Sequence, residues 1–496
     1  MDRLQDQVRT ALAGDPKSEA IEFEGRWYDW GEMRAVANQV TALLDLSGID
    51  ARAPIGFVPR NRPSAIAAEG GMVSSGRTIR MIYAFQAPAG IARDIGRLKL
   101  GAVVAAREDF TPEVLAVVKE QGLAAIALSE MAAVAVEGAE RSTAPLDENA
   151  PTEPQIQVHT SGTTGIPKHV GFSYDQILKY IVGQNVSGVS GTEQDLPPAL
   201  LTYPLGNISG IYMAIPMLAQ RRRAILLDRF TLDGWRDYMR RFKPSAPVLP
   251  PAAMSMVLDA DVPKEELACA KVVMSGAAPL DPTVQKQFEE RYGIPVMLSY
   301  GATEFGGPVT AMTPDLYAAF GDAKRGSVGR PFAGAQLRVV DQETGEELPA
   351  GTEGLLEVIA PRIGENWIRT TDIAIIDADG FLYHRGRADG AIVRGGFKLL
   401  PETIERALCE HPAIAAATVV GLADQRLGQV PAAALVLKRD MPQPTIRELE
   451  DHLRQHVYAT HIPTDWRFVE DLPRNNSFKI DLPGVKALFT RDEQAA

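Results

Sequence analysis

Residues 53–128 alternate between short apolar segments and helical segments, and this alternation constrains the fold more than any other feature. We expect strands at 53–58, 78–84, 102–105 and 124–128, and helices at 63–76, 89–100 and 112–121. Strands that alternate with helices predict a parallel sheet with both faces covered. The chain has 496 residues, too many for one core, so at least two domains are expected.

The alternation resumes downstream, with strands expected at 247–249, 271–275 and 295–299 and a helix at 282–292. Two glycine-containing segments, 276–279 and 300–304, follow two of these strands directly. Ligands of open α/β sheets bind at the carboxyl ends of strands. Both segments are therefore candidates for a binding site.

The last third of the chain changes character twice. Gly, Val, Ile and turn pairs dominate residues 325–386, which predicts a β-rich subdomain. Beyond it, Pro401 opens a helix, strands are expected at 415–420 and 432–437, and Thr445 with Glu448 forms a capping box for a helix through Val457. The predicted fold class is α/β, with a large N-terminal domain of βαβ sheets, this β-rich subdomain, and a small mobile C-terminal α+β domain.

Composition excludes several classes of protein. The net charge of −12 argues against general nucleic-acid binding, which needs clustered positive charge. No apolar run reaches the roughly 18 residues that span a bilayer, and the charged N-terminus does not resemble a signal peptide. The two cysteines, Cys269 and Cys409, form no metal-ligand pattern, which is in keeping with a reducing cytoplasm.

The segment 160–168 reads Thr-Ser-Gly-Thr-Thr-Gly-Ile-Pro-Lys. Glycines allow the backbone to approach a ligand closely, hydroxyls add hydrogen-bond donors, and Lys168 adds a positive charge, so the segment is suited to polyphosphate. It differs from the common nucleotide P-loop, in which the lysine precedes the hydroxyl and a helix follows. Taken alone, a Ser/Thr/Gly run is more typical of a turn or linker.

Further motifs decide between these interpretations. They are Tyr-Gly-Ala-Thr-Glu at 300–304, Trp-Ile-Arg-Thr-Thr-Asp at 367–372, Gly-Arg-Ala-Asp at 386–389, Gly-Gly-Phe-Lys at 395–398, and a lysine, Lys479, within 473–480. In this order and spacing, the series resembles the acyl-adenylate-forming superfamily: acyl- and aryl-CoA ligases, nonribosomal adenylation domains and beetle luciferases. The resemblance covers about residues 20–487.

The resemblance implies a ligase that uses ATP, Mg²⁺ and CoA and acts on a small-molecule carboxylic acid. The acid attacks the α-phosphate of MgATP to give an acyl-adenylate and pyrophosphate, and a thiol then displaces AMP. The first half needs alignment and charge neutralisation more than acid–base chemistry, because a carboxylate is already a nucleophile. Hydroxyls, lysines, a glutamate and a metal ion suit that need.

The resemblance also implies roles for individual residues. Thr303 contacts the α-phosphate and Glu304 binds Mg²⁺, a hard cation that prefers oxygen ligands. Asp372 accepts hydrogen bonds from the ribose, and Arg387 supports the ribose or a phosphate. The β- and γ-phosphates are held by Thr160, Ser161, Gly162, Thr163, Thr164, Gly165 and Lys168, and the adenine slot is formed by Gly276, Ala277, Ala278, Pro279, Tyr300 and Gly301.

Plainer interpretations of these residues stay open. Glu304 is also compatible with a surface carboxylate, and Tyr300 with core packing. For Asp372 and Arg387, an ordinary salt bridge is the alternative.

In the C-terminal part, the resemblance makes Asp389 the hinge between domains 1–388 and 389–496. Lys479 bridges the acyl carboxylate and the α-phosphate during adenylation. A large rotation of the small domain then removes Lys479 and brings in the segment with Gly395, Gly396 and Lys398, where Gly396 lines the pantetheine tunnel. The two half-reactions alternate through this domain movement.

Some positions depart from the family pattern. Phe478 stands where a glycine usually precedes the final lysine. Gly206 and Asn207 stand where many CoA ligases carry an aromatic residue and a histidine, so with Tyr203 they predict a roomier or more polar acyl entrance. Residues 221–223 are three consecutive arginines. Such a run is typical of a solvated surface, and the alternative interpretation is a clamp for the phosphates of CoA.

The leading interpretation is an ATP-dependent acyl-CoA synthetase. One alternative is a freestanding adenylation enzyme that loads the phosphopantetheine thiol of a carrier protein, although no carrier domain is visible in the chain. Another is a non-catalytic nucleotide-binding homologue. The sequence names neither the acid nor the oligomeric state, and it leaves a homodimer open.

Overall fold

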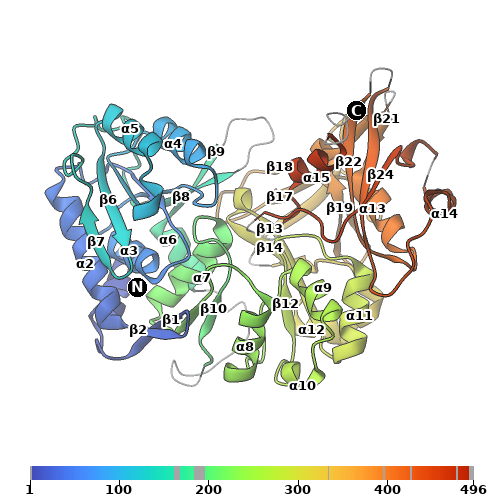
Figure 1. Cartoon of the computed structure of the whole chain (residues 1–496), viewed down its shortest axis with the longest axis horizontal. Coiled ribbons are helices and arrows are strands. Elements are labelled where there is room, and N and C mark those ends of the chain that lie inside the picture. The colour runs from blue at the N-terminus through green and yellow to red at the C-terminus, as the bar shows by residue number, and fades with distance from the viewer. Residues whose placement is uncertain are drawn as a thin grey trace. The chain divides into compact units, whose positions relative to one another are not determined.

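The computed structural model describes residues 3–160, 168–183, 196–332, 334–394, 397–424, 427–457, 459–475 and 479–490 (Figure 1). The chain divides into two compact units. Unit 1 comprises Met1–Val248 and Gly301–Gly307, and unit 2 comprises Leu249–Tyr300 and Pro308–Ala496.

Unit 1 is built on a seven-stranded sheet with the order β7-β6-β5-β3-β4-β8-β9. The five inner strands are parallel, and the edge strands β7 and β9 are antiparallel to their neighbours. The parallel sheet expected from residues 53–128 is thus confirmed. The bounds are β3 (Ile55–Val58), β4 (Ile79–Met81), β5 (Ala102–Ala106), β6 (Ala124–Ser129), β7 (Ala132–Ala135), β8 (Gln155–Thr160) and β9 (Lys168–Ser173).

Helices cover this sheet. A proline stands at the start of α3, α4 and α5, where its missing N–H costs nothing. Ile91 and Ile95 of α4 and Val114 and Val118 of α5 pack into one core with Val103 of β5. The helices are α2 (Trp30–Leu46), α3 (Pro63–Ser74), α4 (Pro88–Arg97) and α5 (Pro112–Glu120), with the 3₁₀ turn η1 (Arg107–Asp109).

A smaller sheet in unit 1 has the order β10-β11-β1-β2. Its strands are β1 (Glu19–Phe23), β2 (Arg26–Asp29), β10 (Ala199–Leu201) and β11 (Ala224–Leu226). The other helical elements of the unit are α1 (Leu4–Ala13), α6 (Tyr174–Ile177), the π-helical turn η2 (Leu178–Val182), α7 (Ile208–Ala219), α8 (Leu232–Phe242) and the 3₁₀ turn η3 (Thr303–Phe305).

Unit 2 contains a sheet with the order β12-β13-β14-β15, in which β12 and β13 are parallel. Its strands are β12 (Val273–Ser275), β13 (Val296–Ala302), β14 (Gly307–Ala311) and β15 (Arg330–Pro331). The accompanying helices are α9 (Pro251–Asp259), α10 (Lys264–Leu267), α11 (Pro282–Tyr292), α12 (Pro314–Phe320) and the turn η4 (Gly321–Lys324).

Two expectations for this region were wrong in detail. No regular strand forms at 247–249, because Pro250 and Pro251 follow at once and Pro251 begins α9. Val248 is nonetheless in a β-bridge, and the Leu249 N–H donates to the Met274 carbonyl at 2.9 Å. The strand expected to end at residue 299 continues to Ala302, so Tyr300 lies within β13 rather than after it.

The β-rich subdomain is confirmed as an antiparallel meander with the order β16-β17-β18-β19. Its strands are β16 (Gln336–Val340), β17 (Gly354–Ile359), β18 (Ile368–Ile376) and β19 (Leu382–Arg387). The register of β18 and β19 places Asp372 directly opposite Arg387.

The C-terminal part is an α+β arrangement around the order β21-β20-β23-β22, with β24 paired to β23. The capping box of Thr445 and Glu448 is confirmed, although the helix ends at Leu453 and not at Val457. The elements are η5 (Ala388–Gly390), β20 (Ile392–Arg394), β21 (Phe397–Leu399), α13 (Pro401–Cys409), β22 (Ile414–Asp424), β23 (Gly428–Leu437), α14 (Ile446–Leu453), η6 (Ala459–His461), β24 (Asp465–Phe468) and α15 (Leu482–Thr490).

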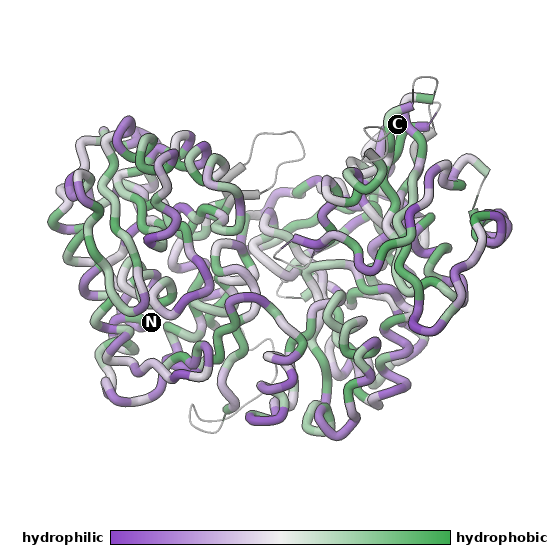
Figure 2. Tube along the Cα trace, viewed as in Figure 1, coloured by the Kyte–Doolittle hydropathy of each residue, from purple (hydrophilic) through white to green (hydrophobic). Residues whose placement is uncertain are grey.

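Hydropathy follows this architecture. Figure 2 shows hydrophobic stretches along the inner strands and hydrophilic residues on the outer turns of the helices. Within the described residues, no helix combines the length and the apolar character needed to cross a membrane. The α/β fold class is confirmed.

Candidate active site

The predicted phosphate loop connects two paired strands. Thr160 is the last residue of β8, Lys168 is the first of β9, and the two face each other in the antiparallel register. A strand, not a helix, therefore follows the lysine, which separates this loop from the common nucleotide P-loop. The predicted residues Ser161, Gly162, Thr163, Thr164 and Gly165 lie outside the described residues.

The turn η3 carries Thr303 and Glu304 and contacts β8, the strand that leads into that loop. Phe305 anchors the turn in the core with 2% exposure. Glu304 is exposed, and among the described residues its carboxylate has no hydrogen-bond or ion-pair partner. The structure thus brings the turn that carries two predicted site residues into contact with the strand that leads into the phosphate loop.

The predicted adenine slot lies at the ends of two neighbouring parallel strands. Residues 276–279 follow β12, and Ser275 pairs with Leu298 of β13, two residues before Tyr300. A Cβ on Gly276 would lie 2.6 Å from Oγ of Ser299, so this close approach requires glycine. Residues 276–279 and Tyr300 thus lie at neighbouring strands, although Tyr300 is inside β13 and not beyond its end as expected.

Asp372 is the centre of a polar cluster in unit 2. The Tyr300 hydroxyl donates a hydrogen bond to Oδ2 of Asp372, and Nε2 of His384 lies 3.2 Å from Oδ1. The rings of Tyr300 and His384 are 5.9 Å apart between centroids. Arg387 donates a hydrogen bond to Oγ1 of Thr371 at 2.8 Å. Three predicted site residues therefore meet, together with a histidine that sequence reasoning missed.

The charge state of Asp372 follows from this environment. Burial of the carboxyl would raise its pKa, but the hydrogen bond and charge of His384, the Tyr300 hydroxyl and the charge of Arg387 outweigh burial and hold the pKa below its ordinary value. No local pattern marks His384, because its strand segment, Leu-Tyr-His-Arg-Gly-Arg, contains other polar residues.

The predicted acyl entrance lies in unit 1, before α7. Asn61 fixes this segment: its Nδ2 donates to the carbonyls of Tyr203 and Leu227 at 3.2 and 3.1 Å, and its Oδ1 accepts from the Leu205 N–H at 3.2 Å. Burial raises the pKa of Tyr203 to about 12. Asn61 was not singled out from the sequence, and no local pattern marks it.

Gly206 and Asn207 take roles that the sequence did not suggest. A Cβ on Gly206 would lie 3.3 Å from the Ile82 carbonyl oxygen and 3.4 Å from Cγ of Pro59, so close packing also favours a glycine at this position. Asn207 is the N-cap of α7, and its Oδ1 accepts a hydrogen bond from the Gly210 N–H at 2.9 Å.

The predicted C-terminal residues lie in turns and a strand of unit 2. Asp389 is in η5, directly after β19, and Lys398 is in β21, whereas Gly395 and Gly396 lie outside the described residues. Lys479 is exposed and pairs with Asn475: its N–H donates to Oδ1 of Asn475 at 3.1 Å, and its carbonyl accepts from the Asn475 N–H at 2.8 Å. Phe478 also lies outside the described residues.

Comparison with known proteins is decisive for the family. A sequence profile described as AMP-binding enzyme matches residues 8–365, and one described as AMP-binding enzyme C-terminal domain matches residues 403–479. The chain belongs to the AMP-binding enzyme family. The resemblance to acyl-adenylate-forming enzymes is confirmed, and Lys479 is the last residue of the C-terminal match.

Individual relatives of this AMP-binding enzyme differ in the molecule to which they join the acid, which is CoA in one and an acyl-carrier protein in another. A sulfoacetate–CoA ligase of Cupriavidus necator is 31% identical over 68% of each chain. A fatty acid–[acyl-carrier-protein] ligase of Streptomyces coeruleorubidus is 25% identical over 96% of this chain and 95% of its own. The ATP-bound structure of MatB from Rhodopseudomonas palustris has a TM-score of 0.80 at 22% identity, over 99% of this chain and 100% of its own, which shows the fold alone.

The arginine run of this AMP-binding enzyme is structural. Arg221 donates hydrogen bonds to the carbonyls of Ala11 and Asp15 and to Ser18, and Arg223 pairs with Glu19 at 2.9 Å. These contacts tie the segment to the N-terminal part of unit 1. The phosphate-clamp interpretation therefore has no support from the described contacts.

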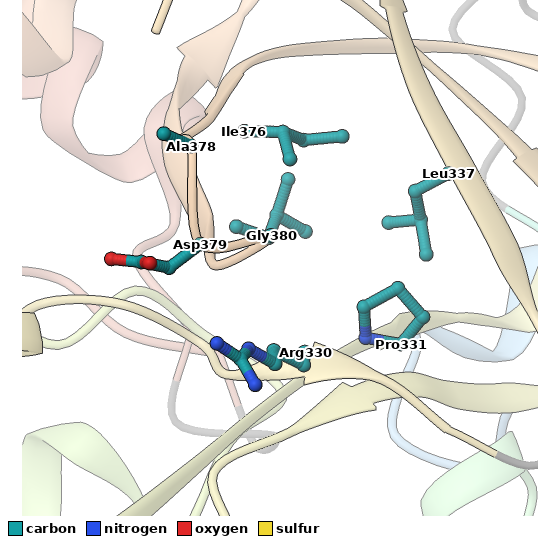
Figure 3. Close-up of a pocket in the computed structure, with 8 residues that line it drawn as sticks. Arg330, Pro331, Leu337, Ile376, Ala378, Asp379 and Gly380 are labelled. Carbon is teal, nitrogen blue, oxygen red and sulfur yellow. The ribbon is translucent and has the colours of Figure 1, made fainter. Parts of the chain in front are cut away.

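A separate hollow of about 650 Å³ opens in the β-rich part of unit 2. Figure 3 shows the apolar side chains of Pro331, Leu337 and Ile376 around it, with the guanidinium of Arg330 and the carboxylate of Asp379 to one side. The guanidinium carbon of Arg330 lies 4.5 Å from the ring centroid of Phe381. None of the predicted site residues lines this hollow.

Proposed function

We propose that the protein is an ATP-dependent acid–thiol ligase that activates a carboxylic acid as its adenylate, releases pyrophosphate and passes the acyl group to CoA. The observation that carries the proposal is the contact between β8 and η3. This contact supports the proposal because β8 leads into the glycine-rich loop and η3 carries Thr303 and Glu304, all within unit 1. Family membership supports the same reaction class.

Each nucleotide-binding role follows the assignment that the family resemblance implies. Loop residues 160–165 and Lys168 would bind the β- and γ-phosphates, and Thr303 the α-phosphate. Residues 276–279 and Tyr300 would enclose the adenine. Each carboxylate oxygen of Asp372 holds one partner and keeps a second acceptor position, so both can still accept a hydrogen bond from a ribose hydroxyl.

The residues present fit a magnesium ion. Mg²⁺ is commonly bound through one or two carboxylates together with substrate phosphates, and it keeps several waters. Glu304 supplies an exposed carboxylate without a described partner, beside the strand that leads into the phosphate loop. When bound, the ion would neutralise charge on the phosphates. Glu304 would hold it, and the loop would hold the phosphates that share it.

The C-terminal residues would act in turn. Lys479 would neutralise charge between the acyl carboxylate and the α-phosphate. We further propose a domain boundary at 388/389, with Asp389 as hinge, so that Gly395, Gly396 and Lys398 serve the thiol-transfer half. A cytoplasmic location suits the two cysteines, Cys269 and Cys409, which form no disulfide bond with each other.

A carrier-protein thiol is the second candidate for the acceptor. The relative that matches nearly the whole chain is a fatty acid–[acyl-carrier-protein] ligase, whereas the relative with the higher identity is a CoA ligase. The choice between the two acceptors rests on the region that binds the pantetheine arm, part of which lies outside the described residues.

The test is acid-dependent release of pyrophosphate from MgATP across a panel of aliphatic, aromatic, dicarboxylic and sulfonated acids. We expect at least one acid to support release, with Asp372→Ala as an inactive comparison. CoA or a phosphopantetheinylated carrier protein, added separately, then identifies the acceptor. Binding of ATP without pyrophosphate release from any acid would instead favour a non-catalytic homologue.

A further inference from the structure

The turn that carries Thr303 and Glu304 is closed at its far end by two glycines. Gly306 and Gly307 have φ values of +69° and +112°, a region that favours glycine. The Gly306 N–H donates to the Thr303 carbonyl at 2.9 Å. Both glycines are buried, so the packing around them determines where this end of the turn lies, and with it the position of the turn.

Tyr212 of α7 contacts that end in two ways. Its hydroxyl donates a hydrogen bond to the Gly306 carbonyl at 2.7 Å. Its ring lies against Gly307 so closely that a Cβ on Gly307 would stand 2.5 Å from ring atoms Cε2 and Cζ. The tyrosine therefore both bonds and packs against the two residues that close the turn.

The base of this contact is rigid. α7 begins at the Asn207 cap, and Ile211, Ala214 and Ile215 around Tyr212 are fully buried. Glu304 has no described partner that would hold its carboxylate, so among the described contacts only the backbone of the turn positions this residue. A shift of the turn would pass directly to the carboxylate, and small misplacements of a binding group are costly.

We propose that Tyr212 is a positioning residue that holds Thr303 and Glu304 in the geometry needed for magnesium-bound ATP. This inference rests on the proposed function, in which Glu304 binds the metal. As a positioning residue, Tyr212 would contact neither the nucleotide nor the metal ion. It acts through the Gly306 carbonyl and the Gly307 backbone.

The test is calorimetric titration with a non-hydrolysable ATP analogue, in Mg²⁺ and in EDTA. Tyr212→Phe keeps the ring that packs on Gly307 and removes the hydroxyl. We expect it to reduce the Mg²⁺-dependent gain in affinity roughly fivefold, the effect of one lost hydrogen bond, while affinity in EDTA stays unchanged. Tyr238→Phe is the matched control, because that hydroxyl also donates to a backbone carbonyl in unit 1, that of Pro198 at 2.9 Å.

A double-mutant cycle with Glu304→Gln distinguishes positioning from general destabilisation. If Tyr212 acts through Glu304, Tyr212→Phe has no further effect once Glu304 is replaced. Independent, additive losses would overturn the inference, as would a Tyr212→Phe protein that matches the wild type or the Tyr238→Phe control. A wild-type protein that binds the analogue equally well with and without Mg²⁺ would overturn the metal role of Glu304 itself, and the inference with it.

Discussion

Nε2 of His384 lies 3.2 Å from Oδ1 of Asp372, and the Tyr300 hydroxyl donates a hydrogen bond to the other oxygen, Oδ2. The two partners divide the carboxylate oxygens between them. They fix its orientation and, against the effect of burial, keep its pKa below the ordinary value. An ionised, oriented carboxylate is what a ribose-binding role requires.

Replacing His384 with Phe should weaken nucleotide binding in a pH-dependent way. Burial remains while the favourable hydrogen bond and charge are lost, so the pKa of Asp372 should rise. A carboxylate accepts ribose hydrogen bonds above its pKa and loses this ability as the pH falls through it. The loss of affinity on acidification should therefore begin at a higher pH in the variant, with affinity at neutral pH reduced about three- to tenfold.

The measurement is the affinity for an ATP analogue as a function of pH. His456→Phe is the control, since His456 is exposed and pairs with Glu410 at 3.3 Å, away from this cluster. Superimposable pH profiles for wild type and His384→Phe would contradict the assigned role.

Lys479 should be required for only one of the two half-reactions. With Lys479→Ala, pyrophosphate formation should fall by roughly a hundredfold or more, because a charge aimed at the transition state is lost. Transfer from a synthetic acyl-adenylate to CoA should stay near the wild-type rate. Lys486→Ala, an exposed lysine on α15, should affect neither step. Equal losses in both half-reactions would argue for a structural role of Lys479.

Much of the fold was predictable because its signals are local. The alternation at 53–128, the prolines that open helices and the Thr445 capping box each depend on residues close in the chain. The placement of residues 276–279 and Tyr300 at neighbouring strands followed from parallel pairing alone.

The contacts that the sequence did not predict join residues far apart in the chain. Tyr300 and Asp372 are 72 residues apart, and Tyr212 reaches Gly306 across 94 residues. Neither pairing leaves a trace in local composition. Gly206 shows the same limit, because an open pocket and a tight packing contact both call for glycine.

Two substitutions of Asn207 should distinguish its role as the N-cap of α7 from a role in recognising the acid. Asn207→Ala removes the N-cap of α7 and should lower the free energy of unfolding by about 1 kcal/mol. Asn207→Asp keeps a capping oxygen and should retain near-wild-type stability, while losing the amide N–H donor. If that donor contacts the acid, both variants should change the acid preference in the pyrophosphate assay. A preference unchanged in Asn207→Asp would limit this residue to capping.

Gly206→Ala is the comparison for packing. The new Cβ would lie 3.3 Å from the Ile82 carbonyl oxygen. We expect a small loss of stability, measured by denaturant unfolding, with the order of preferred acids unchanged. A reordered acid panel would show instead that Gly206 faces the substrate.

Glu69 should make the protein less stable as the pH rises. Its side chain is 1% exposed on α3, neither carboxylate oxygen has a hydrogen-bond partner among the described residues, and burial raises its pKa from 4.5 to about 8. The folded state therefore keeps a proton that the unfolded state has released between these two values, and each such carboxyl lowers the free energy of unfolding by up to about 1.4 kcal/mol per pH unit there. Burial also raises the pKa of Glu405 to about 8, so Glu69→Gln should reduce this slope by roughly half rather than abolish it.

Denaturant unfolding at several pH values across that window measures the slope. Glu357→Gln is the control, because Glu357 is buried but paired with Arg338 at 2.7 Å. Its loss should shift the whole stability curve downward without changing the slope, since an unpaired arginine is charged throughout this range. Parallel curves for wild type and Glu69→Gln would mean that Glu69 is ionised in the folded protein, with a partner or water that satisfies its charge.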